Sequence, residues 1–267
     1  MSWQAIGAST VGISHRRTGQ PCQDAFGSLN VDDETVVAAV ADGAGSAHFG
    51  QVGAQIGVQC TLELIPSLLA DAYPQTLPKW QSLISHVVTT ARTQVEHLAA
   101  SKNQSARNYA ATLLIVVAKA EWIVCGSIGD GAAIFQDAHS ILYSLCPPQR
   151  GEYANATHFF VTPHAEDRLC VRLHDLGQAN APLSSNQVTQ VALLTDGLLE
   201  LALNVAQNRP FQPFFKPLFA FAQEAKLNRH KESVADLGRF LDSERVNART
   251  HDDKTLLLLT RKSPEQR

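Results

Sequence analysis

The sequence has few charged residues and no concentration of either sign. Charged residues make up 18% of its 267 residues, and the formal net charge is -3. Basic residues occur only in short groups such as Arg16-Arg17. A protein that binds nucleic acid carries a basic run or patch, so we expect no nucleic-acid partner. Apolar residues make up 45%, which is typical of a globular domain rather than a disordered chain.

Paired cysteines and long apolar runs are also missing. No two of the five cysteines form a CxxC pair, which argues against a zinc site or a disulfide framework. We expect most of the cysteines to be small apolar core residues of a protein in a reducing compartment. The apolar stretches have the length of strands, far short of a membrane span. The first residues lack the pattern of a secretory signal, so we expect a cytoplasmic protein without membrane contact.

The apolar pattern separates helices from strands along the chain. Period-four spacing predicts one helix over about 51–70 and another after Pro78, and a helical stretch follows Gly197. Short apolar runs predict strands within 1–13, 36–41, 110–118, 122–128, 132–135, 158–162, 171–174, 188–195 and 256–260. Residues 145–157 are expected to form a surface loop. This order indicates an α+β domain with two antiparallel sheets covered by helices.

Several predicted strands end at an aspartate that is followed by a glycine. Asp42-Gly43, Asp130-Gly131 and Asp196-Gly197 share this arrangement, and Asp252-Asp253 precedes the last strand. Hard divalent cations prefer carboxylate oxygens, and a sheet fixes the positions of its strand ends. Asp-Gly is also a common turn dipeptide, so each pair alone is consistent with a plain turn. Their recurrence at the most apolar strands favours a metal site.

Taken together, these motifs resemble those of the metal-dependent protein phosphatase family, the type 2C serine/threonine phosphatases, in its bacterial form. The matching segments follow the family's order over nearly the whole chain: 23–25 (QDA), 40–46 (VADGAGS), 111–113 (ATL), 126–131 (GSIGDG), 194–198 (LTDGL) and 252–255 (DDKT). The resemblance implies a four-layer α-β-β-α sandwich, with two antiparallel sheets flanked by helices. Residues 1–262 would form a single phosphatase domain, and 263–267 a short polar C-terminal tail.

The resemblance also implies two metal ions, Mn²⁺ or Mg²⁺. Asp42 would bridge both ions, and the carbonyl of Gly43 would bind one of them. Asp196 and Asp252 would complete the protein ligands of the other ion. The implied reaction is direct, in-line attack of a metal-bridging hydroxide on the phosphate, without a phosphoenzyme.

Further roles follow from the same resemblance. Asp130 would help to hold a third, weaker ion, and Asp24 would act through metal-bound water. Gln23 stands where the family usually has glutamate, and its amide is expected to hydrogen-bond that water. One of Arg16 and Arg17 would grip the phosphate, and we take Arg17 as the candidate.

The general acid is left open by the sequence. Ala44 takes the place of a histidine that animal members of the family carry after the first Asp-Gly. His15 and His48 lie nearby in the sequence and are the alternatives, although a lone loop histidine is more often an ordinary surface residue.

The implied substrate is a phosphorylated serine/threonine protein, a cognate kinase would be a further partner, and a monomer is expected. Two other functions stay open: a catalytically inactive module that binds phosphoproteins, and a hydrolase of a small phosphorylated metabolite.

Overall fold

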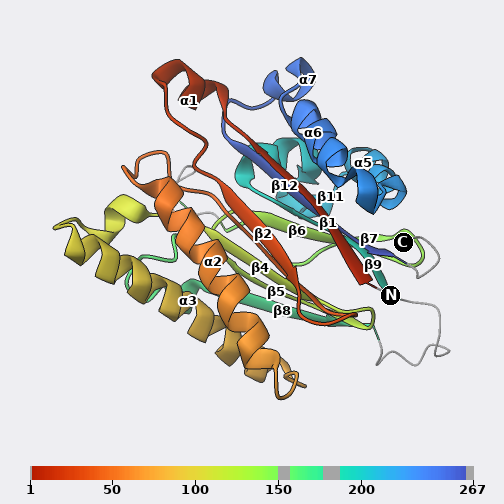
Figure 1. Ribbon diagram of the computed structural model, residues 1–267, viewed down its shortest axis with the longest axis horizontal. Helices are drawn as coiled ribbons and strands as arrows, with labels where there is room; N and C mark the ends of the chain where they lie inside the picture. The colour runs from red at the N-terminus through yellow and green to blue at the C-terminus, as the bar shows by residue number, and fades with distance from the viewer. Residues whose placement is uncertain (1, 150–156, 177–186, 263–267) are drawn as a thin grey trace.

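The computed structural model describes residues 2–149, 157–176 and 187–262, and shows two five-stranded antiparallel sheets packed face to face (Figure 1). The first sheet contains, in order across it, β1 (Ser2–Thr10), β12 (Lys254–Lys262), β9 (Val188–Leu194), β6 (Ala132–Asp137) and β7 (Leu142–Ser144). The second contains β2 (Ala25–Asn30), β3 (Val36–Ala41), β4 (Leu113–Ala118), β5 (Trp122–Ile128) and β8 (Cys170–Asp175). The predicted α+β sandwich is confirmed.

Both faces of the central strands are buried, which explains why their sequences are apolar throughout. Side chains alternate between the two faces of a strand. In β3, alternate residues pack between the sheets (Val36, Ala38, Val40) and against the helices (Val37, Ala39, Ala41). A strand that is covered on both sides needs no polar alternation, so a continuous apolar run fits it.

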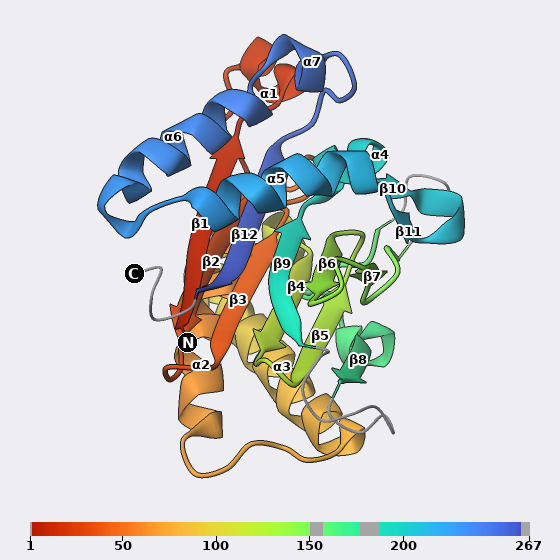
Figure 2. The ribbon, with the colours of Figure 1, turned by 90° about the vertical axis from the view of Figure 1, so that its right-hand side faces the viewer.

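Helices cover the outer face of each sheet (Figure 2). The long helices α2 (Gly50–Leu69) and α3 (Leu77–Ser101) pack on the second sheet. On the first sheet lie α5 (Gln212–Glu224) and α6 (His230–Leu241), and the short α7 (Glu244–Asn247) follows α6 beyond the strand ends. Other short elements are α1 (Ile13–Thr18), α4 (Leu199–Ala202), and the two-residue strands β10 (Leu203–Asn204) and β11 (Arg209–Pro210).

Helix α2 qualifies the expectation that no apolar segment approaches the length of a membrane span. Among the described helices it is the one whose length and hydropathy would suit such a span. Core helices pass the same test, and α2 packs against β2, β3 and α3. We therefore assign it to the core.

The predicted strand at 158–162 is wrong. These residues form an irregular turn in which Phe160 and Val161 are buried beneath the helices. The Phe160 N–H donates to the carbonyl oxygen of Ala111 at 3.0 Å, which anchors the turn beside the strand ends. The segment is apolar because it fills the core, not because it pairs. Residues 150–156 of the predicted loop and the tail 263–267 lie outside the described residues.

The cysteines are free thiols. Cys60, Cys125 and Cys146 are buried, whereas Cys22 and Cys170 are partly exposed. Burial, followed by the nearby charges of Asp24 and Asp253, raises the pKa of the Cys22 thiol. The nucleophile of a cysteine phosphatase is a thiolate with a lowered pKa, so Cys22 does not fit that role.

Candidate active site

One edge of the sandwich gathers carboxylates from four separate segments. Asp42 follows β3, Asp130 lies between β5 and β6, and Asp196 follows β9. One carboxylate oxygen from each of these three residues lies within 4.8 Å of the others. Asp252 precedes β12, and its negative charge helps to raise the pKa of both Asp42 and Asp196. The fold therefore brings together four aspartates that the sequence singled out.

The backbone of Asp42 is fixed by a reciprocal pair of hydrogen bonds with Thr112. The Asp42 N–H donates to Thr112 Oγ1 at 2.9 Å, and the Thr112 N–H donates to the carbonyl oxygen of Asp42 at 2.8 Å. The next residue, Gly43, forms an isolated antiparallel β-bridge with Ala111. A side chain on Gly43 would place its Cβ 2.4 Å from the carbonyl carbon of Gly50, so this turn requires glycine.

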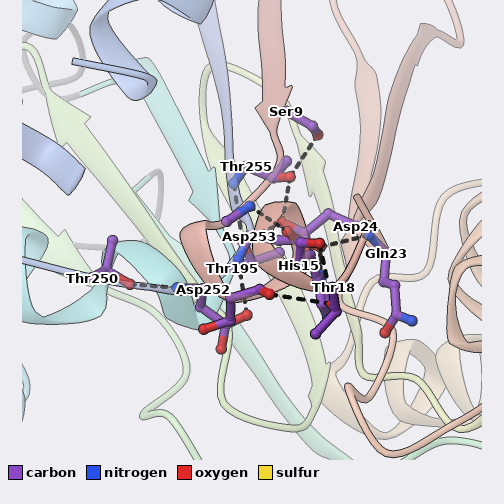
Figure 3. A network of polar contacts seen from close by, with 12 residues as sticks. Ser9, His15, Thr18, Gln23, Asp24, Thr195, Thr250, Asp252, Asp253 and Thr255 are labelled. Carbon is purple, nitrogen blue, oxygen red and sulfur yellow. Dashed lines mark hydrogen bonds and ion pairs between the residues drawn. The ribbon is translucent and has the colours of Figure 1, made fainter. Parts of the chain in front are cut away.

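Asp24 is a buried carboxylate beside Asp42, and Figure 3 shows it among the threonines that hold it. Its Oδ2 accepts hydrogen bonds from Thr195 Oγ1 at 2.8 Å and Thr255 Oγ1 at 2.6 Å. Its Oδ1 is buried and meets no hydrogen-bond donor among the described residues. Burial raises the pKa of Asp24 to about 6 although the two threonine hydroxyls lower it. A buried oxygen without a donor is what a nearby cation or ordered water would satisfy.

Crowding makes the cluster unfavourable as a set of bare anions. Burial, then the charges of Asp130 and Asp252, raises the pKa of Asp196 to about 8. Burial, then the charges of Asp24, Asp196 and Asp252, raises the pKa of Asp42 well above its ordinary value. Carboxylates that share a site cannot all ionise without compensation. An all-oxygen, highly acidic donor set of this kind fits hard divalent cations.

Asp253 ties the N-terminal segment to this edge (Figure 3). Its Oδ1 accepts a hydrogen bond from the Gly12 N–H at 2.6 Å. Its Oδ2 accepts one from the Gln23 N–H at 2.6 Å and lies 2.9 Å from His15 Nδ1. All three partners precede Asp253 by more than two hundred residues. Asp253 therefore fixes the loop that carries Gln23 and Asp24.

Gln23 packs its amide against the backbone of the first Asp-Gly turn, and its expected hydrogen bond to metal-bound water stays a prediction. The residue is 6% exposed, and one end of its amide lies against the carbonyl oxygens of Gly43 and Ala44. With the amide nitrogen at that end it donates to Gly43 O at 2.9 Å and to Ala44 O at 3.2 Å, whereas the opposite orientation would set oxygen against oxygen. Neutral amide and carbonyl groups are complementary here, because the carbonyls have lone pairs and no proton to give. Gln23 thereby orients the carbonyl of Gly43.

The loop arginines and histidines occupy different surroundings. Arg16 pairs with Asp242 at the end of α6. Arg17 is exposed, and its guanidinium has no ion-pair partner in the described part of the chain. His15 is held by Asp253 with 12% of its side chain exposed, whereas His48 is exposed on the loop after Gly45.

Sequence reasoning missed the hydroxyls that hold Asp24. Ser9 and Thr255 face each other on β1 and β12, and their hydroxyls lie 2.6 Å apart. Thr255 in turn donates its N–H to Thr195 Oγ1 at 3.1 Å. The available signal was a threonine adjoining each acidic motif, at Thr195 before Asp196 and at Thr255 after Asp253.

Comparison with known proteins decides the family. Residues 11–242 match the family model described as Protein phosphatase 2C. The chain is 35% identical over 265 residues to Serine/threonine-protein phosphatase 3 of Escherichia coli (strain K12), covering 97% of this chain and 98% of that one. The chain belongs to the protein phosphatase 2C family. The family and phosphatase class predicted from the sequence are confirmed.

Solved structures share the fold of this phosphatase 2C chain. The serine/threonine phosphatase Stp1 from Staphylococcus aureus superposes with a TM-score of 0.60 at 14% identity, covering 98% of this chain and 96% of that one. The S. agalactiae serine/threonine phosphatase gives a TM-score of 0.61 at 14% identity, with 97% and 100% covered. At these identities the likeness is one of fold.

Proposed function

We propose that this phosphatase 2C chain removes phosphate from phosphoserine and phosphothreonine in proteins, in one in-line displacement by water and without a phosphoenzyme. The observation that carries the proposal is the cluster of Asp42, Asp130 and Asp196, whose carboxylate oxygens lie within 4.8 Å of one another. Such a cluster needs divalent cations to be stable in its ionised form.

The ligands are assigned as follows. Asp42, the Gly43 carbonyl, Asp196 and Asp252 would hold a pair of ions. Asp130, whose Oδ2 accepts a hydrogen bond from Thr157 Oγ1 at 2.5 Å, would help to hold a third, weaker ion. Mn²⁺ or Mg²⁺ suits these oxygen donors. The chemistry supplied by such a pair is activation of water near neutral pH and neutralisation of phosphoryl charge.

The chain's own residues position that chemistry. Asp24 offers its buried Oδ1 to water at the cluster, because its Oδ2 is already occupied by two threonines. Gln23 fixes the direction of the Gly43 carbonyl. Arg17, exposed and without an ion-pair partner in the described part of the chain, is available to a substrate phosphate. His15 acts as the structural partner of Asp253.

The test is hydrolysis of p-nitrophenyl phosphate and of phosphoserine and phosphothreonine peptides, with Mn²⁺ or Mg²⁺ and with excess EDTA. We expect turnover that requires the cation and that Asp42→Asn abolishes. Asp71→Asn, an exposed change in the loop after α2, serves as the control and keeps full activity. Turnover that persists in EDTA contradicts the proposal. A panel of sugar phosphates and nucleotides tests the metabolite alternative, and binding without turnover would indicate the inactive module.

We further propose that residues 1–262 act as one phosphatase domain, monomeric and cytoplasmic, opposite a cognate serine/threonine kinase. Light scattering after size-exclusion chromatography tests the monomer. A mass of twice 28.9 kDa would contradict it.

A further inference from the structure

An apolar cavity opens in the helix layer that covers the first sheet. It has a volume of about 470 Å³ and lies among α4, α5, α6, α7 and the segment that leads into α5. Four phenylalanines line it: Phe211, Phe214, Phe221 and Phe240. Phe211 is 53% exposed. Cavities of this size and lining are typical of binding sites for large apolar groups.

A second hollow of about 460 Å³ continues the first. The two share Leu201, Phe211 and Arg245, and the second adds Arg249 and Glu200. We call the two hollows together the aromatic groove. It is apolar at the α5–α6 end and polar at the end that α4 and α7 form.

The polar end of the aromatic groove carries available positive charge. Arg245 and Arg249 are exposed, and within the described ranges neither lies at ion-pair distance from a carboxylate. Asp236, which lines the apolar end, is paired with Arg239. Glu200 offsets part of the charge. An occupant with one acidic side chain beside an apolar one would match this arrangement.

The aromatic groove adjoins the candidate active site through two short stretches of chain. Glu200 follows Asp196 by four helical residues, which span about 7 Å. Arg249 precedes Asp252 by three residues, which span at most about 11 Å. An extended peptide advances about 3.3 Å per residue, so side chains about three to five residues from a phosphoserine at the aspartates would reach the groove.

We propose that the aromatic groove docks a segment of the phosphoprotein substrate. This proposal rests on the function proposed above. A leucine or phenylalanine side chain of the substrate enters the cavity among the phenylalanines. An aspartate or glutamate between it and the phosphorylated residue meets Arg245 and Arg249. The groove thus selects phosphoproteins that carry an acidic and then a large apolar residue on one side of the phosphorylated residue.

The experiment compares two series of phosphoserine peptides with p-nitrophenyl phosphate, which is too small to reach the groove. Anchored peptides carry an acidic residue and a leucine three to five positions from the phosphoserine, on either side; plain peptides carry alanine at both places. The enzyme variants are Phe211→Ala and Arg245→Glu. Their matched controls are Leu227→Ala, at an exposed apolar residue outside the groove, and Lys231→Glu, at an exposed base on α6.

We expect the best anchored peptide to exceed its plain counterpart at least tenfold in kcat/KM, as burial of one large apolar side chain allows. Phe211→Ala and Arg245→Glu should each remove most of that advantage, through KM, while plain peptides and p-nitrophenyl phosphate are unaffected. Equal kcat/KM for both series at every spacing would overturn the groove. So would variants that slow p-nitrophenyl phosphate equally.

Fluorescence anisotropy of labelled, dephosphorylated peptides reads docking without turnover. Tighter binding of the anchored peptide by a protein that does not hydrolyse p-nitrophenyl phosphate would overturn the proposed function and support the groove. Turnover of p-nitrophenyl phosphate with no preference for the anchored peptide in either measurement would support the proposed function and overturn the groove as a docking site.

Discussion

Threonine side chains position the acidic residues at the edge of the sandwich that forms the candidate active site, which we call the active edge. Thr112 holds the backbone of Asp42, and Thr195 and Thr255 together hold one oxygen of Asp24. The other oxygen of Asp24 has no donor among the described residues. The neighbouring carboxylates raise one another's pKa values, so their crowding has a measurable cost when no cation is present.

The pH dependence of the metal-free protein should report this cost through Asp196. Its folded pKa is about 8 against an ordinary value of 3.8, so the folded state binds the proton more tightly than the unfolded state. Its contribution to stability is therefore complete below about pH 4 and is lost as the pH rises through about 8. We expect the melting temperature in EDTA to fall between pH 5 and pH 8.5.

The variant Asp196→Asn lacks this titration and should lose less stability over the same interval. At pH 8.5 without metal it should be more stable than the parent protein, by an amount on the order of a few kcal/mol. Asp71→Asn should follow the parent at both pH values. If Asp196→Asn and the parent protein lose the same stability between pH 5 and pH 8.5, the neighbouring carboxylates do not raise the pKa of Asp196.

Gln23 is a second residue whose chemistry is set by close neighbours. Gln23→Glu would bury a carboxylate against the carbonyl oxygens of Gly43 and Ala44 and remove two hydrogen bonds. We expect a loss of about 2–3 kcal/mol in unfolding free energy in EDTA, measured by urea denaturation. Mn²⁺ should restore part of it, because a nearby dication stabilises the new charge. The exposed change Gln207→Glu is the control. If Gln23→Glu leaves the urea midpoint in EDTA unaltered, the contact between Gln23 and the carbonyl oxygens is contradicted.

At the scale of elements, the contact between α2 and the turn before β4 limits which side chains α2 can carry. A Cβ on Gly53 would lie 1.9 Å from the carbonyl oxygen of Tyr109, which sits on the short turn Ala106–Tyr109. That turn leads directly to Ala111 and Thr112, and Thr112 is hydrogen-bonded to the backbone of Asp42. Close packing here sets the position of the active edge.

Two glycine-to-alanine changes in helices should therefore have opposite effects. Gly53→Ala in α2 forces the helix away from Tyr109 and should cost several kcal/mol, since backbone atoms cannot yield as a flexible side chain can. Gly238→Ala in α6 meets nothing within 4 Å and should stabilise by up to about 1 kcal/mol, the gain in helix propensity. Thermal melts of both variants provide the test. A stable Gly53→Ala protein would contradict the close approach.

Elements that bury both faces were predictable from the sequence, and marginal ones were not. Val36–Ala41 and Trp122–Ile128 were predicted with their observed bounds because the first is continuously apolar and the second is apolar apart from Gly126 and Ser127. Strand β2 was missed because all of its side chains are partly or fully exposed. The turn at 158–162 was mistaken for a strand because Phe160 and Val161 are buried by tertiary packing, which a local pattern cannot distinguish from pairing.

At the scale of the whole molecule, the active edge is assembled by contacts between the ends of the chain. β1 pairs with β12 from Ser2↔Lys262 to Thr10↔Lys254, which brings Gly12 and His15 to Asp253. The candidate aspartates could be named from the sequence because each follows or precedes a strand. Their hydrogen-bond partners could not, because those depend on register and on which strands are neighbours.

This dependence on the whole fold predicts that cations should stabilise the entire domain. An ion that binds only the folded state adds about 2.7 kcal/mol per site when its free concentration is a hundred times its dissociation constant. For a chain of this size that corresponds to a rise of about 5–11 °C in melting temperature for each site. We expect a rise of this order when Mn²⁺ replaces EDTA at pH 7.5, measured by differential scanning calorimetry.

Asp42→Asn should lose most of the rise, yet melt in EDTA no lower than the parent protein, because one fewer carboxylate relieves the repulsion. Asp71→Asn should show the full rise. If the parent protein melts at the same temperature in Mn²⁺ and in EDTA, the aspartate cluster does not hold the ion.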